Sequence, residues 1–212
     1  MARNRLCLWM LMTGVCLLLA GCAGMKQPPQ NRHYYVLEYD SPLRENVPAL
    51  PLILKIERFD ASPIYDSTRM IFKRQAFTRD EYVYHQWRVA PGEMISDNLQ
   101  RDFKTTAALA AVIRFDMVSA TDALCILKGT VEEFYMSAAS GKASAILAVS
   151  TTLTRRKPGG LTEAILAQHR YRIAEPLEDH SPAGFAAAMS HAARRFSQAL
   201  MSDVLQVMEE QF

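Results

Sequence analysis

The sequence predicts an α+β fold, with a mainly antiparallel sheet in one layer and two helices packed on one of its faces. Three observations lead to this class. Short apolar segments that alternate with polar residues fill most of the chain, a helical pattern interrupts them at about 91–107, and another ends the chain at about 182–210. Strands, a helix, more strands and a second helix, in this order, are typical of a two-layer domain.

Length and composition limit the possible classes. The 212 residues are enough for one domain with a sizeable core. Half of them are apolar and 22% are charged, which excludes a disordered chain and a collagen-like repeat. Only one segment approaches the apolarity of a membrane core, which excludes a protein with several membrane spans.

That apolar segment, at the start of the chain, predicts a lipoprotein signal peptide over residues 1–21. Arg3 and Arg5 precede the apolar run 6–20, which is shorter than the ~20 residues that span a membrane. Leu19-Ala20-Gly21-Cys22 then resembles a bacterial lipobox, in which the cysteine thiol takes a diacylglyceryl group, cleavage exposes its amine and a third chain is added. An ordinary secretory signal with a cysteine there by chance is the alternative.

The resemblance implies an anchor in the outer membrane, facing the periplasm. Each buried methylene contributes about 0.8 kcal/mol, so two or three acyl chains on Cys22 would hold stably. Ala23 follows, and the lack of Asp there resembles the sorting signal for the outer membrane. Residues 22–33, with two prolines, are predicted to be the lipidated cysteine and a flexible tether, and residues 34–212 the domain.

Loss of the leader also changes the charge and the cysteine content. Removing its two arginines leaves 22 basic and 22 acidic residues, which gives no electrostatic reason to expect nucleic-acid binding. Cys7 and Cys16 leave with the leader and Cys22 would be acylated, so only Cys125 remains and no intramolecular disulfide can form. Cys125 lies in an apolar run, which favours a small buried residue over a reactive thiol.

Alternating and aromatic segments predict the strands of the first half. They are residues 34–39, 52–59, 69–73, 81–87 and 110–115. Within 81–87, a period of two places Tyr82, Tyr84 and Gln86 on one face and Val83, His85 and Trp87 on the other. The helix at about 91–107 starts at Pro91, where a missing N–H is harmless, and its apolar stripe is Ile95, Leu99 and Phe103.

The second half predicts a three-stranded antiparallel meander followed by a long helix. Residues from 124, 145–153 and 165–173 each alternate with period two and are joined by short polar connections. Ser181 is a plausible N-cap with Pro182 in the first turn, and apolar residues then recur every three or four positions.

The chain contains no motif of a catalytic or cofactor site. A nucleophile elbow, a Walker loop, a dinucleotide-binding loop and a His-Glu-x-x-His pair are all missing from the sequence. The five histidines lack the spacing of metal ligands, so we expect no enzyme, no cofactor and no metal site. Glu132 and Glu133 are adjacent on a predicted strand, and we expect their carboxylates on opposite faces, unable to share a substrate. The basic cluster 155–157 fits an exposed turn, or a contact with anionic headgroups.

One cluster of aromatic residues allows two interpretations. Tyr82, Tyr84 and Trp87, together with Tyr34 and Tyr35, are denser than the aromatic residues elsewhere. They either pack in the core and along the edge of a small sheet or form a subunit interface, where tyrosine and tryptophan supply rigid contact area.

The order of these motifs resembles the ABC-type transport auxiliary lipoprotein family over about 34–212. Glu57-Arg58 is more polar than the usual pattern of this family. The residues that carry the resemblance are Tyr34, Tyr35, Leu37, Ile56-Glu57-Arg58-Phe59, Tyr65, Met70-Ile71-Phe72-Lys73, Tyr82-Val83-Tyr84-His85-Gln86-Trp87, Pro91 and Leu99.

The resemblance implies a non-catalytic outer-membrane component of an intermembrane transporter for lipids or hydrophobic solutes. Its partner would be the mammalian-cell-entry protein of an ABC transport system, and the lipoprotein itself would form a homo-oligomer. Two other functions stay open. One is a lipoprotein regulator or ring subunit of a peptidoglycan-synthesis or polysaccharide-secretion complex, and the other is a periplasmic enzyme whose active site follows no motif, which a pocket of converging titratable groups would support.

Overall fold

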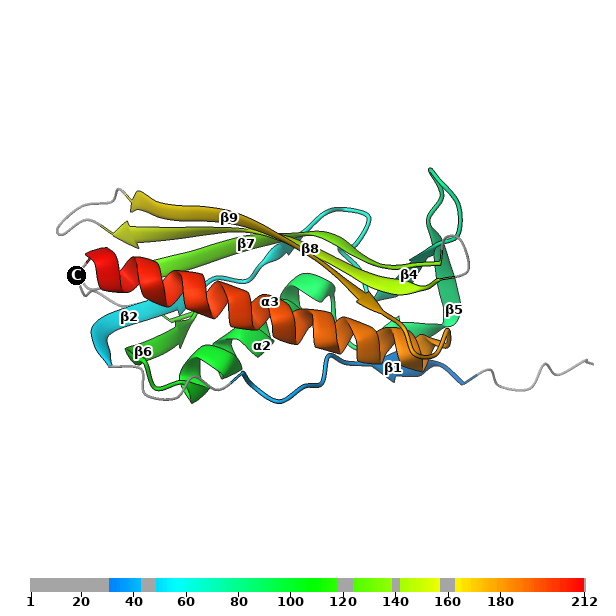
Figure 1. Cartoon of the computed structure of the whole chain (residues 1–212), viewed down its shortest axis with the longest axis horizontal. Helices are drawn as coiled ribbons and strands as arrows, with labels where there is room; N and C mark the ends of the chain where they lie inside the picture. The colour runs from blue at the N-terminus through cyan, green and yellow to red at the C-terminus, as the bar shows by residue number, and fades with distance from the viewer. Residues whose placement is uncertain (1–30, 43–48, 118–123, 139–141, 157–162, 212) are drawn as a thin grey trace, which may run out of the picture. The chain divides into compact units, whose positions relative to one another are not determined.

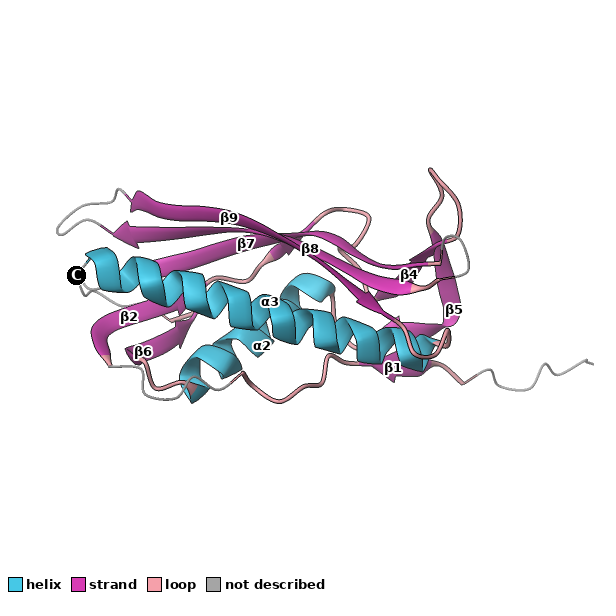
Figure 2. Ribbon diagram, in the orientation of Figure 1, coloured by secondary structure: helices cyan, strands magenta, loops and turns pink. Residues whose placement is uncertain are grey.

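The computed structural model describes residues 31–42, 49–117, 124–138, 142–156 and 163–211. From Arg32 onward these residues form one compact unit with a common core of apolar side chains from the sheet and both helices. The elements of this unit are drawn in Figure 1 in chain order and in Figure 2 by type.

The longest strand, β7 (Leu124–Ser137), organises the sheet. Along one edge it pairs antiparallel with β8 (Ser144–Arg156), which in turn pairs antiparallel with β9 (Glu163–Pro176). The meander predicted from the alternating pattern is therefore confirmed. Short connections favour this arrangement, because consecutive strands joined by tight links run in opposite directions.

Along its other edge, β7 pairs with three short strands in succession, all parallel to it. They are β2 (Leu50–Ile56), β3 (Asp60–Ala61) and β4 (Arg69–Lys73), which meet the beginning, middle and end of β7. The sheet continues outward from the first and last of these. Here β6 (Leu109–Arg114) pairs parallel with β2, β5 (Asp80–Trp87) pairs antiparallel with β4, and β1 (His33–Tyr35) pairs parallel with β5.

The sheet is mixed: most of its paired residues are antiparallel, as predicted, but it also contains parallel pairings that the sequence analysis did not predict. Its two longest pairings are antiparallel, whereas β2, β3 and β4 all meet β7 in parallel. Parallel neighbours need a crossover connection, and here the chain passes through α2 (Pro91–Thr105) and β6 before it returns as β7. The predicted strand at 34–39 is also shorter, because β1 ends at Tyr35.

Both helices form where their apolar stripes predict them, at Pro91–Thr105 and, for α3, at Pro182–Gln211. Ser181 caps α3, since its hydroxyl accepts a hydrogen bond of 3.0 Å from the Gly184 N–H. In Figure 1, α3 runs along β8 and β9, which it contacts, and it also touches α2. Its apolar stripe is buried, including Phe185, Met189 and Phe196, and each such side chain contributes about 1.5–3 kcal/mol.

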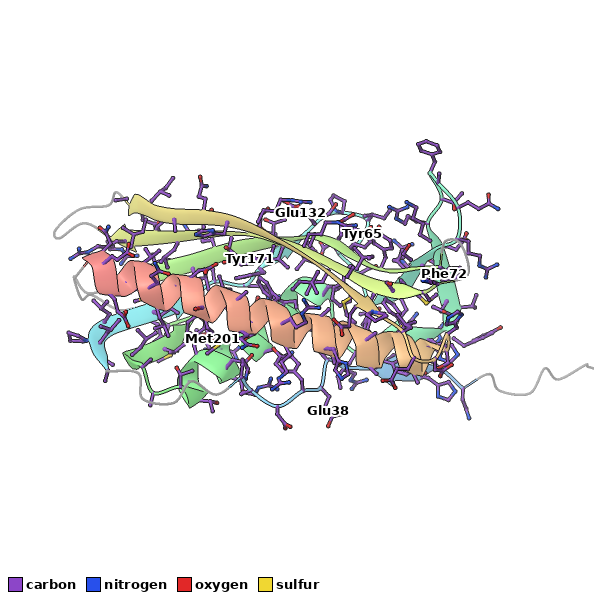
Figure 3. The ribbon with its side chains drawn as sticks, viewed as in Figure 1. Glu38, Tyr65, Phe72, Glu132, Tyr171 and Met201 are labelled. Carbon is purple, nitrogen blue, oxygen red and sulfur yellow. The ribbon has the colours of Figure 1, made fainter. Side chains whose placement is uncertain are left out.

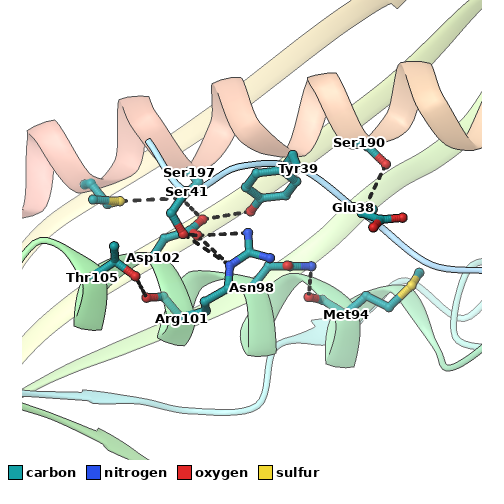
Figure 4. A network of polar contacts seen from close by, with 11 residues as sticks. Glu38, Tyr39, Ser41, Met94, Asn98, Arg101, Asp102, Thr105, Ser190 and Ser197 are labelled. Carbon is teal, nitrogen blue, oxygen red and sulfur yellow. Dashed lines mark hydrogen bonds and ion pairs between the residues drawn. The ribbon is translucent and has the colours of Figure 1, made fainter. Parts of the chain in front are cut away.

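Between β1 and β2, the chain crosses the two helices and is fastened to both (Figure 4). The Glu38 N–H donates a hydrogen bond of 3.0 Å to Ser190 Oγ on α3. Tyr39 Oη and Ser41 Oγ donate to the carboxylate of Asp102 on α2, at 2.8 and 2.5 Å. The segment that follows the predicted tether is thereby held at three points.

Candidate functional site

The predicted lipidation site Cys22 lies outside the described residues, whereas the three predicted interface residues lie on β5. Trp87 is completely buried and packs edge-on against Phe134 and Phe185, with ring centroids 5.2 and 5.5 Å apart. It therefore belongs to the core of this unit and has no exposed surface to offer a partner. Tyr84 is 40% exposed and Tyr82 is half-buried.

The strand β5 is irregular, so its side chains do not alternate as predicted. Arg69 faces Gln86, but Ile71, only two residues later, faces Glu81. The extra residues of β5 form a bulge, which changes the direction of the side chains within it. As a result the rings of Tyr82 and His85, predicted on opposite faces, meet edge-on at 5.9 Å. His85 also lies 2.9 Å from the Tyr35 hydroxyl.

The hairpin of β4 and β5 ends in an exposed aromatic tip, which the sequence analysis did not identify. Residues 74–79 connect the two strands, and Phe77 at the tip is fully exposed with φ of 66°. A bulky residue in this left-handed region costs about 1–3 kcal/mol. The sequence signal that could have found it is a lone aromatic residue in an otherwise polar connection between two strands.

Stacked rings and two arginines brace the base of this tip. Arg79 lies 4.6 Å above the ring of Tyr135, and that ring stacks on the ring of Tyr65 at 6.1 Å. The Nε of Arg79 also donates a hydrogen bond to Tyr65 Oη at 3.4 Å. Burial raises the pKa of the Tyr65 phenol, so it remains a neutral hydroxyl at physiological pH. On the other side, Arg74 lies 4.8 Å above the ring of Phe72 (Figure 3 labels Tyr65 and Phe72).

Exposed apolar side chains gather on this hairpin and on the strand beside it. Nine large apolar side chains are exposed among the described residues, and five belong to the hairpin, to β1 or to the residue after β1. Exposed apolar side chains that concentrate on a few elements are a common feature of interaction sites. These five are Tyr34, Val36, Phe77, Val83 and Tyr84.

A second bulge brings Glu132 and Glu133 to the same side of the sheet, so the expectation of opposite faces is wrong. Val131 faces Val149 and Glu133 faces Ala148, which leaves Glu132 as the extra residue. Glu132 accepts a hydrogen bond from Arg170 at 2.6 Å and Glu133 one from Arg172 at 2.8 Å. The two arginines are two residues apart on β9 and share a face.

Each of these carboxylates has its own arginine partner, which suits surface ion pairs. A hydrogen bond from Ser150, followed by that from Arg170, lowers the pKa of Glu132 (labelled in Figure 3). The lowered pKa keeps the Glu132 carboxylate an acceptor at neutral pH.

Two carboxylates beside the turn of the chain that leads into α3 already have partners. A cavity of about 240 Å³ lies where β9 leads into α3 and is lined by Glu175, Asp179 and His191, among others. Glu175 pairs with Arg195 at 2.9 Å, and Asp179 accepts the Ser181 N–H at 3.0 Å. Within the described ranges, no group of three His, Cys, Asp or Glu side chains is placed to hold a metal ion.

Cys125 is buried in the core, and burial raises the pKa of its thiol to about 11.

Of the basic cluster predicted at 155–157, Arg155 and Arg156 end β8, while the turn that follows lies outside the described residues. In the part of the chain that the structure describes, no helix has the length and apolarity needed to cross a membrane.

Comparison with known proteins yields a family and several similar folds. The model of the family described as "ABC-type transport auxiliary lipoprotein component" matches residues 35–201. Among curated proteins, none matches the sequence significantly.

Three solved structures resemble the fold. The crystal structure of protein XCC0632 from Xanthomonas campestris, of the family DUF330, has a TM-score of 0.74 at 20% identity and covers 84% of this chain and 98% of its own. An uncharacterized protein gives a TM-score of 0.63 at 8% identity, covering 82% and 99%. The hypothetical protein CT253 from Chlamydia trachomatis gives 0.52 at 9% identity, covering 75% and 98%. At these identities the likeness shows the fold alone.

Proposed function

The chain belongs to the family of ABC-type transport auxiliary lipoprotein components, and from this premise we propose that it is the outer-membrane-anchored, non-catalytic auxiliary subunit of an intermembrane transport system. The system would carry lipids or other hydrophobic solutes and would contain a mammalian-cell-entry protein, to which this lipoprotein docks from the periplasm. The match of the family over residues 35–201 is the observation that carries the proposal.

The anchor is the first part of the proposed mechanism. The lipobox resemblance at 19–22 supports acylation of Cys22, and Ala23 supports sorting to the outer membrane. Acyl chains bury enough methylene groups for stable attachment when two or more are present. The tether of residues 23–33 then links this anchor to the domain. The segment that follows it is attached to both helices by the hydrogen bonds of Glu38, Tyr39 and Ser41.

The domain is the second part, and its role is docking. We take the helices and the sheet as two layers of one rigid body, which the contacts of α3 with β8 and β9, and of α2 with β2 and β6, support. The exposed apolar side chains around β1 and β5, Tyr84 among them, supply contact surface for a partner or for further copies of the chain. Hydrolysis of ATP would take place in another subunit of the transporter.

Membrane fractionation and mass spectrometry test the anchor. The wild-type protein is expected in the outer-membrane fraction with acyl groups on a mature N-terminus at Cys22. Cys22→Ala should remove the acyl mass and the outer-membrane association, whereas Cys125→Ala, which changes the other remaining thiol, should leave both unchanged. Unchanged outer-membrane association of Cys22→Ala would count against the proposal.

Photo-crosslinking in cells tests the docking. A photoreactive amino acid at Tyr84 is expected to capture the mammalian-cell-entry protein or a second copy of this chain, and the same amino acid at Ile165, exposed on β9, is the matched control. Capture of a peptidoglycan synthase or a polysaccharide-export protein at Tyr84 would contradict the proposal.

A further inference from the structure

We propose that the tip of the β4–β5 hairpin inserts Phe77 into the surface of a phospholipid bilayer and places Arg74 beside anionic headgroups. The hairpin would be a second membrane contact, independent of acyl attachment. The identity of the membrane, as the one that holds the Cys22 anchor, rests on the proposed function.

The side chain of Phe77 is presented in a way that the fold alone does not require. It is fully exposed and held at a φ of 66°, a conformation that bulky residues rarely adopt. A phenyl ring gains free energy in proportion to the apolar area that it removes from water, and this one removes none within the described unit. Residues in such strained backbone conformations cluster at functional sites.

The charges around the tip favour a bilayer as the occupant. In the chain, Lys73 and Arg74 precede Phe77 and Arg79 follows it. Of the two acidic residues that come next, Asp80 is exposed and Glu81 is paired with Arg69 at 2.8 Å. Aromatic and basic residues together are typical of protein segments at the boundary between acyl chains and anionic headgroups. Arg79 lies over Tyr135 at the hairpin base and is half-buried, whereas Arg74, which lies over Phe72, is exposed.

The position of the anchor makes this contact reachable. His33, the first residue of β1, faces His85 on β5, the strand that leads away from the tip. Phe77 and His85 are roughly 26 Å apart at most along an extended strand. The tether from Cys22 to His33 can extend to about 40 Å, so a bilayer holding the acyl chains lies within reach of the tip.

Tryptophan fluorescence in vesicles tests the inference directly. Phe77→Trp and Ile165→Trp variants of the purified lipoprotein are each added to vesicles of phosphatidylethanolamine and phosphatidylglycerol that contain lipids with brominated acyl chains. Ile165 is 63% exposed near the opposite end of the sheet, at the start of β9. Trp87 is buried and contributes the same background to both variants.

The expected result is that bromolipids quench the emission of the tryptophan at 77 and shift it to shorter wavelength, with no change at 165. In the Phe77→Trp background, Arg74→Gln, or vesicles without phosphatidylglycerol, should reduce the quenching. Emission at 77 that is unchanged by vesicles would overturn the inference. So would a shift that requires added purified mammalian-cell-entry protein, since the tip would then be a protein contact.

The two proposals fail in different ways. An anchored protein whose tryptophan at 77 is unquenched refutes the hairpin contact and leaves the anchor intact. If mass spectrometry finds no acyl groups on Cys22 and the tryptophan at 77 is still quenched, the hairpin contact is supported and the anchor is refuted.

Discussion

Ser197 on α3 donates a hydrogen bond of 2.6 Å to the carboxylate of Asp102 on α2, and both side chains are completely buried. Tyr39 and Ser41 donate to the same carboxylate (Figure 4), so three hydroxyl groups from two other segments converge on one charge. Burial, followed by the negative charge of Asp102, raises the pKa of the Tyr39 phenol, which keeps it protonated as a donor. The buried carboxylate is tolerated because these hydrogen bonds and an ion pair with Arg101, at 3.0 Å, satisfy it.

Removing this carboxylate is predicted to be strongly destabilising. Asp102→Ala leaves the buried Ser197 hydroxyl and the half-buried hydroxyl groups of Tyr39 and Ser41 without their acceptor, and we expect the free energy of unfolding to fall by about 3–5 kcal/mol. Chemical denaturation measures it. Asp97→Ala changes an exposed aspartate on the same helix and should alter stability by less than about 0.5 kcal/mol. Equal effects of the two substitutions would show that the network contributes little.

The close approach of Phe59 to Gly129 predicts a second sensitive position. Phe59 is buried, and a Cβ added at Gly129 on β7 would lie within 2.6 Å of its Cζ. Alanine normally stabilises a strand relative to glycine, but here overpacking should reverse the sign. We expect Gly129→Ala to lower the free energy of unfolding by about 1–3 kcal/mol.

A double-mutant cycle checks this cause. Leucine at position 59 lacks the ring atoms that the added Cβ would meet, so Gly129→Ala should cost less in a Phe59→Leu background. An identical cost in both backgrounds would assign the effect to the β7 backbone.

Local periodicity explains why the sequence predicted both helices and the β7–β8–β9 meander. The stripe Ile95, Leu99 and Phe103 and the alternation from residue 124 depend only on neighbouring residues. The parallel pairing of β2, β3 and β4 with β7 depends on contacts between distant segments, and no local pattern encodes it. No local pattern encodes the bulge at Glu132 either, and because of this bulge the side chains of β7 do not alternate between faces there.

The candidate site was only partly predictable for related reasons. Aromatic composition drew attention to β5, but composition does not separate buried Trp87 from exposed Tyr84. Phe77 was missed because its only sequence signal is one aromatic residue in a polar connection, which does not separate a core residue from an exposed one; its exposure comes from the structure.

The end of α2 predicts a stabilising substitution. Ala107 follows the C-cap residue Thr106 and has φ of 49°, a left-handed conformation that glycine adopts without strain. We expect Ala107→Gly to raise the free energy of unfolding by about 1 kcal/mol. Ala187→Gly, at an exposed position inside α3, should lower it by about 1 kcal/mol. Thermal unfolding that moves in the same direction for both would contradict the role of the φ value.

The buried thiol of Cys125 predicts how stability depends on alkaline pH. Burial raises its pKa from 9.0 to about 11, so the unfolded state loses this proton at lower pH than the folded state. The contribution is therefore complete below pH 9 and is lost as the pH rises from 9 to 11. Denaturation at several pH values should show a fall in this window that is smaller in Cys125→Ala. In the folded wild type, the thiol should react with alkylating reagents only as fast as the protein opens. Rapid alkylation at pH 8 without unfolding would show that this side chain is accessible, and it would remove the physical basis of the predicted pH dependence.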